Sequence, residues 1–159
     1  MPLNNLSGHS FQKSLVVDLI KSAMISKVEW DVITRIACDI VNYTIAEDEI
    51  AAGSKKKDIL KELNRLRTIH GDEPSTIHAL GLYTQNSKRK IRFFKLSYQI
   101  SIRNNEFNDA LDAANSAFDF CMEMKLTDRV IVWRERVESL LSHATDRESL
   151  DEARRLLDQ

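Results

Sequence analysis

The stretch NEFNDALDAANSAFDFCM, residues 105–122, decides the fold of this 159-residue chain. Its apolar residues recur at intervals of three and four positions, which places them on one face of an α-helix. These residues are Phe107, Ala110, Leu111, Ala114, Ala117, Phe118, Cys121 and Met122. Several of them are small, and small side chains let two helices approach closely. We therefore expect a helix here that packs tightly against its neighbours.

The same periodicity recurs along the rest of the chain and predicts about eight helices. They lie at residues 10–24, from 27 onwards, at 54–69, around 77–83, and at 88–102, 107–122, 127–141 and 145–157. No segment alternates apolar and polar residues as a half-buried strand does, and the chain contains only four Gly and two Pro. The sequence therefore predicts an all-α fold of antiparallel helix hairpins joined by short loops.

Polar residues before the apolar stripes predict where helices begin. Ser26 and Glu29 form a capping box, in which each side chain accepts a hydrogen bond from the other residue's backbone N–H. The helix that follows either runs on to Gly53 or breaks near Thr44, where Thr44 and Glu47 offer a second box. Further starts are predicted at Ser54, at Ser75 and at the pair Thr145 and Glu148.

The interval Gly71-Asp72-Glu73-Pro74-Ser75 is the clearest boundary in the sequence. Glycine is common just after the last residue of a helix, and Pro74 disfavours helical geometry at the residue before it. We expect an N-terminal helical part at residues 1–71 and a C-terminal helical part at residues 75–159, or one continuous domain.

Charge is distributed unevenly along the chain, although 23 Lys and Arg nearly balance 24 Asp and Glu in total. Residues 1–53 carry 4 basic and 7 acidic side chains, residues 54–103 carry 12 and 4, and residues 104–159 carry 7 and 13. A basic middle segment between acidic flanks is compatible with a polyanion site, with a contact between copies of the chain, or with internal salt bridges.

Two predicted helices, within residues 54–70 and 87–103, carry most of these cations. The candidate partner-binding residues are Lys55, Lys56, Lys57, Lys61, Lys88, Arg89, Lys90, Arg92 and Lys95. Three interpretations stay open: a solvated or internally paired face, a surface for a protein partner with acidic groups, and a surface for nucleic-acid phosphates with Phe93 stacking on a base. Pairing between the basic middle and an acidic flank of another copy would give a homo-oligomer.

A weak internal repeat links two of the C-terminal helices at an offset of 43 residues. Asn105-x-Phe107-x-x-Ala110-Leu111 aligns with Glu148-x-Leu150-x-x-Ala153-Arg154, and Ala114 aligns with Leu157. The pattern resembles the second helix of a tetratricopeptide-type repeat, in which a bulky residue is followed by alanines on one face. Phe107, Ala110, Ala114 and Ala117 hold those places.

The tetratricopeptide resemblance covers residues 88–159, less than half of the chain. It departs from the family in three ways: the offset exceeds the usual ~34 residues, the Gly and Tyr pair of the first helix is missing, and no Pro closes the unit. It implies a binding scaffold that presents a concave surface to a peptide or helix of another protein. A generic bundle that uses alanine for close packing is the alternative.

No catalytic motif is present: the sequence lacks a phosphate-binding Gly-rich loop, a dinucleotide fingerprint, His-Glu-x-x-His and Gly-x-Ser-x-Gly. His70, Asp72, Glu73 and His78 could supply metal ligands, but their spacing matches no familiar site, and a helix end with a polar loop is the favoured interpretation. We therefore expect a non-enzymatic protein without a cofactor or metal.

The sequence also favours a cytoplasmic protein. Cys38 and Cys121 lie in apolar helical patterns and are expected to be free thiols, which persist in a reducing compartment. Residues 1–10 carry no positive charge, and the apolar stretch at 15–20 is interrupted by Asp18, so neither a signal peptide nor a membrane span is expected. The expected function is a regulator or adaptor that binds another macromolecule. A nucleic-acid-associated factor that uses the two basic helices is the alternative.

Overall fold

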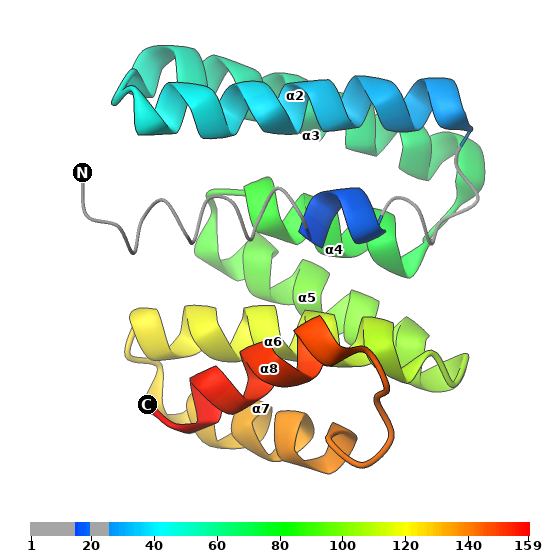
Figure 1. Ribbon diagram of the computed structural model, residues 1–159, viewed down its shortest axis with the longest axis vertical. Helices are drawn as coiled ribbons and strands as arrows, with labels where there is room; N and C mark the ends of the chain where they lie inside the picture. Colours follow the sequence, from blue (N-terminus) through cyan, green and yellow to red (C-terminus); the bar gives the residue numbers. More distant parts are fainter. Residues whose placement is uncertain (1–14, 20–25) are drawn as a thin grey trace. The chain divides into compact units, whose positions relative to one another are not determined.

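The computed structural model describes residues 15–19 and 26–159 (Figure 1). Every regular element in these residues is an α-helix, so the predicted all-α fold is confirmed. Residues 15–19 are helical, and the later helices are α2 (Lys27–Ile45), α3 (Glu49–His70), α4 (Pro74–Tyr83), α5 (Ser87–Arg103), α6 (Phe107–Glu123), α7 (Thr127–Leu140) and α8 (Arg147–Leu157). The other residues of the first predicted helix lie outside the described residues. Within the described part, no helix combines the length and the apolarity needed to cross a membrane.

The chain divides into two compact units, Met1–Gln85 and Asn86–Gln159. The division follows α4, whereas the sequence predicted a boundary before this helix, at residues 71–75. α4 belongs to the first unit because it packs against α3. Pro74 does not prevent this packing, since proline is well accommodated at the first position of a helix.

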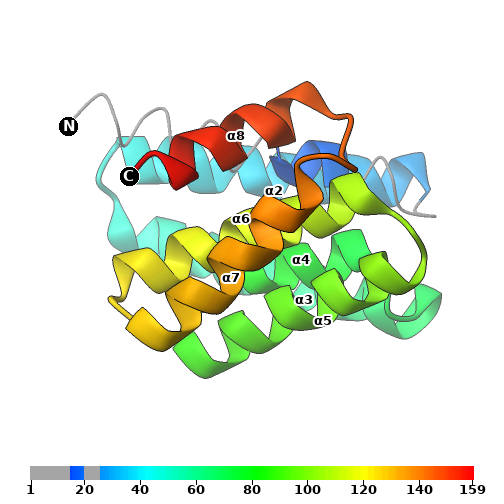
Figure 2. The ribbon, with the colours of Figure 1, turned by 90° about the horizontal axis from the view of Figure 1, so that it is seen from below.

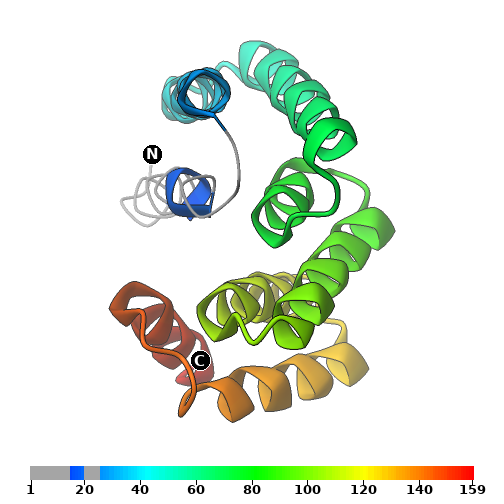
Figure 3. The ribbon, with the colours of Figure 1, turned by 90° about the vertical axis from the view of Figure 1, so that its right-hand side faces the viewer.

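In the first unit, α2 and α3 pack side by side as a hairpin (Figure 3). α2 ends at Ile45, so the helix breaks near Thr44, which was one of the two predicted alternatives. Thr44 does not cap the next helix, because its hydroxyl donates instead to the carbonyl oxygen of Ile40 at 2.7 Å.

α3 begins earlier in the sequence than predicted. Asp48 is the capping residue, and its carboxylate accepts a hydrogen bond from the backbone N–H of Ala51 at 3.1 Å. α3 therefore runs straight through Gly53 and Ser54, and the predicted start at Ser54 is wrong. An acidic side chain in this position also stabilises the positive end of the helix dipole, which a serine cannot do.

The sequence predicted the end of α3 correctly but placed the start of α4 at the wrong residue. α3 ends at His70 and is capped by Gly71, as expected, and this glycine has a φ of 81°. α4 begins at Pro74 with Glu73 in the capping position, so the predicted cap at Ser75 is wrong. Ser75 is buried within the first turn, because Pro74 takes the first helical position and the residue before it, Glu73, is the cap.

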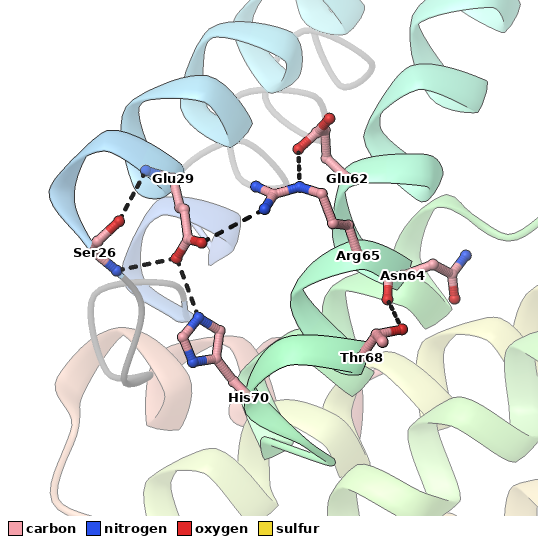
Figure 4. Close-up of polar contacts among 7 residues, drawn as sticks. All are labelled: Ser26, Glu29, Glu62, Asn64, Arg65, Thr68 and His70. Atoms are coloured by element: carbon pink, nitrogen blue, oxygen red, sulfur yellow. Dashed lines mark hydrogen bonds and ion pairs between the residues drawn. The ribbon is translucent and has the colours of Figure 1, made fainter.

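A polar network joins the start of α2 to the end of α3 (Figure 4). The predicted capping box is confirmed, since the Glu29 carboxylate accepts from the backbone N–H of Ser26 while the Ser26 hydroxyl accepts from that of Glu29. Glu29 Oε2 also lies 3.1 Å from His70 Nε2, and Oε1 lies 3.6 Å from Arg65 Nη1. The hydrogen bond to His70 lowers the pKa of the Glu29 carboxyl.

In the second unit, α6 is the central helix, and α5, α7 and α8 all pack against it (Figures 2 and 3). Its alanines and its cysteine have no exposed surface: Ala110, Ala113, Ala114, Ala117 and Cys121. The predicted close packing of this alanine face is thereby confirmed.

The same three-residue turn connects α2 to α3, α5 to α6, and α6 to α7. The middle residue of each turn has a positive φ: Glu47 (60°), Asn105 (57°) and Lys125 (56°). The next backbone N–H donates to a carbonyl in the last turn of the preceding helix at 2.9 Å: Asp48 to Tyr43, Glu106 to Ser101, and Leu126 to Cys121. This is the hydrogen bond of a Schellman-type helix end.

The start of α8 corrects the last predicted cap. Asp146 caps this helix, and its Oδ2 accepts from the backbone N–H of Ser149 at 3.0 Å. The backbone N–H of Thr145 is satisfied from another helix, since it donates to Asn108 Oδ1 at 2.8 Å. The predicted box of Thr145 and Glu148 is therefore wrong. The sequence did not reveal the contact with Asn108, because this residue is remote from Thr145 along the chain.

Candidate partner-binding surface

The nine candidate cations lie on two helices in different units. Lys55, Lys56, Lys57 and Lys61 belong to α3 in the first unit, and Lys88, Arg89, Lys90, Arg92 and Lys95 belong to α5 in the second. The candidate cations therefore belong to two surfaces, one on each unit.

The cations of α3 are partly neutralised within the first unit. Lys55 Nζ lies 3.7 Å from Asp39 Oδ2 on α2 and 3.9 Å from Asp58 Oδ2. Arg65 pairs with Glu29 and Glu62, and Arg67 with Asp72 at 2.7 Å. Lys57 and Lys61 are exposed. Internal pairing therefore accounts for three of the six cations of α3, but not for Lys56, Lys57 and Lys61.

The cations of α5 have a different environment. α5 contains six Lys and Arg residues and no Asp or Glu. One exposed face carries Lys88, Arg92, Lys95, Gln99 and Arg103, which we call the α5 stripe. Their spacings of four, three, four and four residues place them on one side of the helix. Among the described residues, none of these four cations lies within ion-pair distance of a carboxylate.

Lys90 differs from the stripe because its ammonium points over aromatic rings. Its Nζ lies 5.5 Å from the centroid of Phe94 and 5.8 Å from that of Phe120, both within cation–π distance. Phe94 is 2% exposed, and Phe93 is half-buried. The exposed face of α5 thus offers charge without a fully exposed aromatic ring on which a base could stack.

Aromatic contacts hold α5 to α7. The rings of Tyr98 and Trp133 meet edge to face, with centroids 5.5 Å apart. The Arg136 guanidinium lies 4.5 Å from the Trp133 centroid and 5.1 Å from that of Tyr98. Sequence reasoning missed these contacts, because nothing local relates residue 98 to residue 133. It also missed Arg103, which the four-residue spacing from Gln99 could have revealed.

A partly buried polar cluster joins α6 to α8. Ser149 Oγ lies 2.5 Å from Asp112 Oδ1 and 2.6 Å from Asp146 Oδ2. A hydroxyl has a single proton, so Ser149 can donate fully to only one of these two carboxyl groups at a time. Burial raises the pKa of Asp112 to about 7, and the charges of Asp109, Asp146 and Glu148 act in the same direction.

A shallow cavity of about 370 Å³ lies at the start of α6 and beside the loop that precedes α8. Its lining consists of Asn105, Glu106, Phe107, Asn108, Asp109, His143 and Thr145. Burial raises the pKa of Asp109 to about 6, with a further contribution from the neighbouring Glu106 carboxylate. The His143 ring packs on Phe107, with centroids 5.1 Å apart.

The remaining candidates are the histidines of the possible metal site and the two cysteines. His70 contacts Glu29, while His78 is fully buried on α4. In the described ranges no group of three or more His, Cys, Asp and Glu side chains could hold a metal ion. Cys38 and Cys121 are free thiols, and burial raises the pKa of Cys121 to about 11, far from the range of a reactive thiolate.

Comparison with known proteins finds no match to a family model, a curated protein or a solved structure.

Proposed function

We propose that this chain is a non-enzymatic interaction module, a regulator or adaptor, that binds an acidic surface of another protein through the α5 stripe. The observation that carries the proposal is the contrast between the two basic helices. Three of the six cations on α3 (Lys55, Arg65 and Arg67) have carboxylate partners in their own unit, whereas none of the four cations of the α5 stripe has one among the described residues. Solvated cations on one helix face are available to an external anion.

The construction of the second unit supports the same proposal. The aromatic contacts of Tyr98 with α7 and the burial of Phe94 fix α5 from behind, so the stripe is presented by a supported helix. Ala110, Ala114 and Ala117 are buried in positions where a tetratricopeptide-type repeat has small residues. By analogy with that fold, we propose a repeat-like scaffold. The analogy does not identify the partner.

Nucleic acid is the second candidate partner, because a helix face without carboxylates also attracts phosphates. The partial burial of Phe93, the ring expected to stack on a base, favours the protein partner, since single-stranded nucleic acid is usually bound with exposed aromatic rings. We place the activity in the cytosol, where the free thiols of Cys38 and Cys121 would stay reduced.

The test compares the tagged wild type with a stripe variant, Lys88→Ala/Arg92→Ala/Lys95→Ala, and with a control variant, Lys56→Ala/Lys57→Ala/Lys61→Ala on α3. Proteins bound in the producing cell are identified by cross-linking and mass spectrometry, with and without nuclease. Binding of duplex and single-stranded oligonucleotides is measured in parallel at physiological salt.

We expect the stripe variant to lose a nuclease-resistant protein partner that the control variant keeps. Retention of every partner by the stripe variant would contradict the proposal. Tight oligonucleotide binding by the wild type, lost in the stripe variant, would replace the protein partner with nucleic acid. The slope of affinity against salt provides a further check, because phosphate contacts release counterions and weaken steeply as salt rises.

A further inference from the structure

We propose that the α5 stripe docks on the outward face of α7 in a second copy of this chain. The inference rests on the proposed function and names the partner of the same surface. Its basis is a second exposed helix face in the same unit, which has the opposite charge and an apolar centre.

The outward face of α7 carries Asp128, Ile131, Val132 and Glu135. The core-facing side of this helix consists of Trp133, Val137 and Leu140, which are all buried. Ile131 is 60% exposed and Val132 is 44% exposed. Single exposed apolar residues are common on protein surfaces, but these two are adjacent and lie between two carboxylates. Among the described residues, neither Asp128 nor Glu135 has a cation within ion-pair distance.

The spacing of the two faces matches. Asp128 and Glu135 are seven residues apart, and so are Lys88 and Lys95. At a rise of about 1.5 Å per residue, each pair spans about 10.5 Å along its helix. Two antiparallel helices placed face to face would therefore bring Lys88 near Glu135 and Lys95 near Asp128. In a parallel pair Lys88 would instead lie near Asp128 and Lys95 near Glu135, with the same agreement in spacing.

Arg92 would then lie over the apolar centre. It occupies the position between Lys88 and Lys95 on the stripe, opposite Ile131 and Val132. Arginine covers apolar surface with its alkyl stem while its guanidinium stays near water and carboxylates. Each exposed ion pair contributes little by itself, so the burial of Ile131 and Val132 supplies an attraction that salt does not screen.

Both faces occur in every copy, which favours a closed dimer. In a two-fold arrangement, α5 of each copy meets α7 of the other, and the same contact is made twice. The dimer should be weak and sensitive to salt, because four of its contacts are exposed ion pairs.

Analytical ultracentrifugation of the full chain at low and high salt tests this proposal. One variant reverses the stripe, Lys88→Glu/Lys95→Glu, and another reverses the α7 face, Asp128→Lys/Glu135→Lys. The matched control, Lys57→Glu/Lys61→Glu, changes the same number of exposed lysines on α3. Far-ultraviolet circular dichroism checks that each variant keeps its helix content.

We expect the wild type and the control to dimerise at low salt, and each reversed variant to dimerise at least about tenfold more weakly. An equal mixture of the two reversed variants should associate again, because opposite charges then face each other once more. A wild type that stays monomeric at low salt and high concentration, or a mixture that does not associate, would overturn the inference. If the wild type is monomeric while the Ala stripe variant still loses a protein partner, the inference fails and the proposed function stands.

Discussion

Ala114 shows how a single small residue determines the packing of the second unit. It has no exposed surface, and neither have Ala110 and Ala117 one turn before it and one turn after it. Because α6 contacts three other helices, the space beside each alanine is already filled by a neighbouring helix. A larger side chain there would have to displace that neighbour.

Replacing Ala114 with leucine should lower the free energy of unfolding by about 1 to 3 kcal/mol, because overpacking forces helices apart or side chains out of their preferred rotamers. Chemical denaturation followed by circular dichroism measures the change. Ala46→Leu is the control, since Ala46 is exposed and the added volume is the same. An unchanged unfolding midpoint for Ala114→Leu would mean that this face of α6 is open to solvent.

Lys55 and Lys88 show what the sequence could not reveal about the candidate surface. Both lie in cationic helices, and the sequence identified both as candidate partner-binding residues. Only the fold shows that Lys55 contacts Asp39 on another helix, at 3.7 Å. The residue type and the amphipathic spacing could be predicted, because they are local. The identity of the neighbour across a helix interface could not.

The starts of the helices could likewise be predicted only where the contacts that define them are local. The capping box of Ser26 and Glu29 was predicted because both of its hydrogen bonds lie within four residues. The cap at Thr145 was wrong because Asp146 competes for the position and Asn108 of α6 takes the Thr145 N–H. The approximate positions of most helices could be predicted from local spacing. Their exact first residues could not, because neighbouring residues compete to cap a helix and some hydrogen-bond acceptors are distant in sequence.

The junction of α6 and α8 should make the second unit less stable as the pH rises through 7. Burial raises the pKa of Asp112 to about 7, above its ordinary value of 3.8, so the folded state holds this proton more tightly than the unfolded state. The stabilisation is complete below pH 3.8 and is lost as the pH rises through about 7. Asp109, with a pKa raised to about 6, acts in the same direction.

Asp112→Asn should remove most of this dependence, because an amide stays neutral and can still donate a hydrogen bond to Ser149. Urea unfolding midpoints measured from about pH 5 to about pH 8 should fall with rising pH in the wild type and change less in the variant. Asp151→Asn on the exposed face of α8 is the control. Parallel curves for the wild type and Asp112→Asn would assign the pH dependence to other groups.

Each of the two units of the molecule is close to electrically neutral. The first unit contains 10 basic and 11 acidic side chains, and the second contains 13 of each. The basic middle segment is therefore not a charged domain, since the boundary at Gln85 divides it. The charge is separated within the second unit instead, between α5 and the helices that follow it.

The turn that recurs in both units has a consequence for the stability of the chain at high temperature. A left-handed backbone crowds the β-carbon of most residues, and glycine avoids this cost at the expense of a more flexible unfolded chain. Glu47→Gly and Lys125→Gly should each stabilise the chain, by about 0.5 kcal/mol, with a higher melting temperature. Asn105→Gly should gain less, since asparagine already tolerates this conformation. Lys125→Ala is the control, because alanine keeps the β-carbon, and an equal gain from alanine would refute the explanation. If both glycine variants melt higher, two of the three turns carry a conformational cost that the rest of the fold has been offsetting.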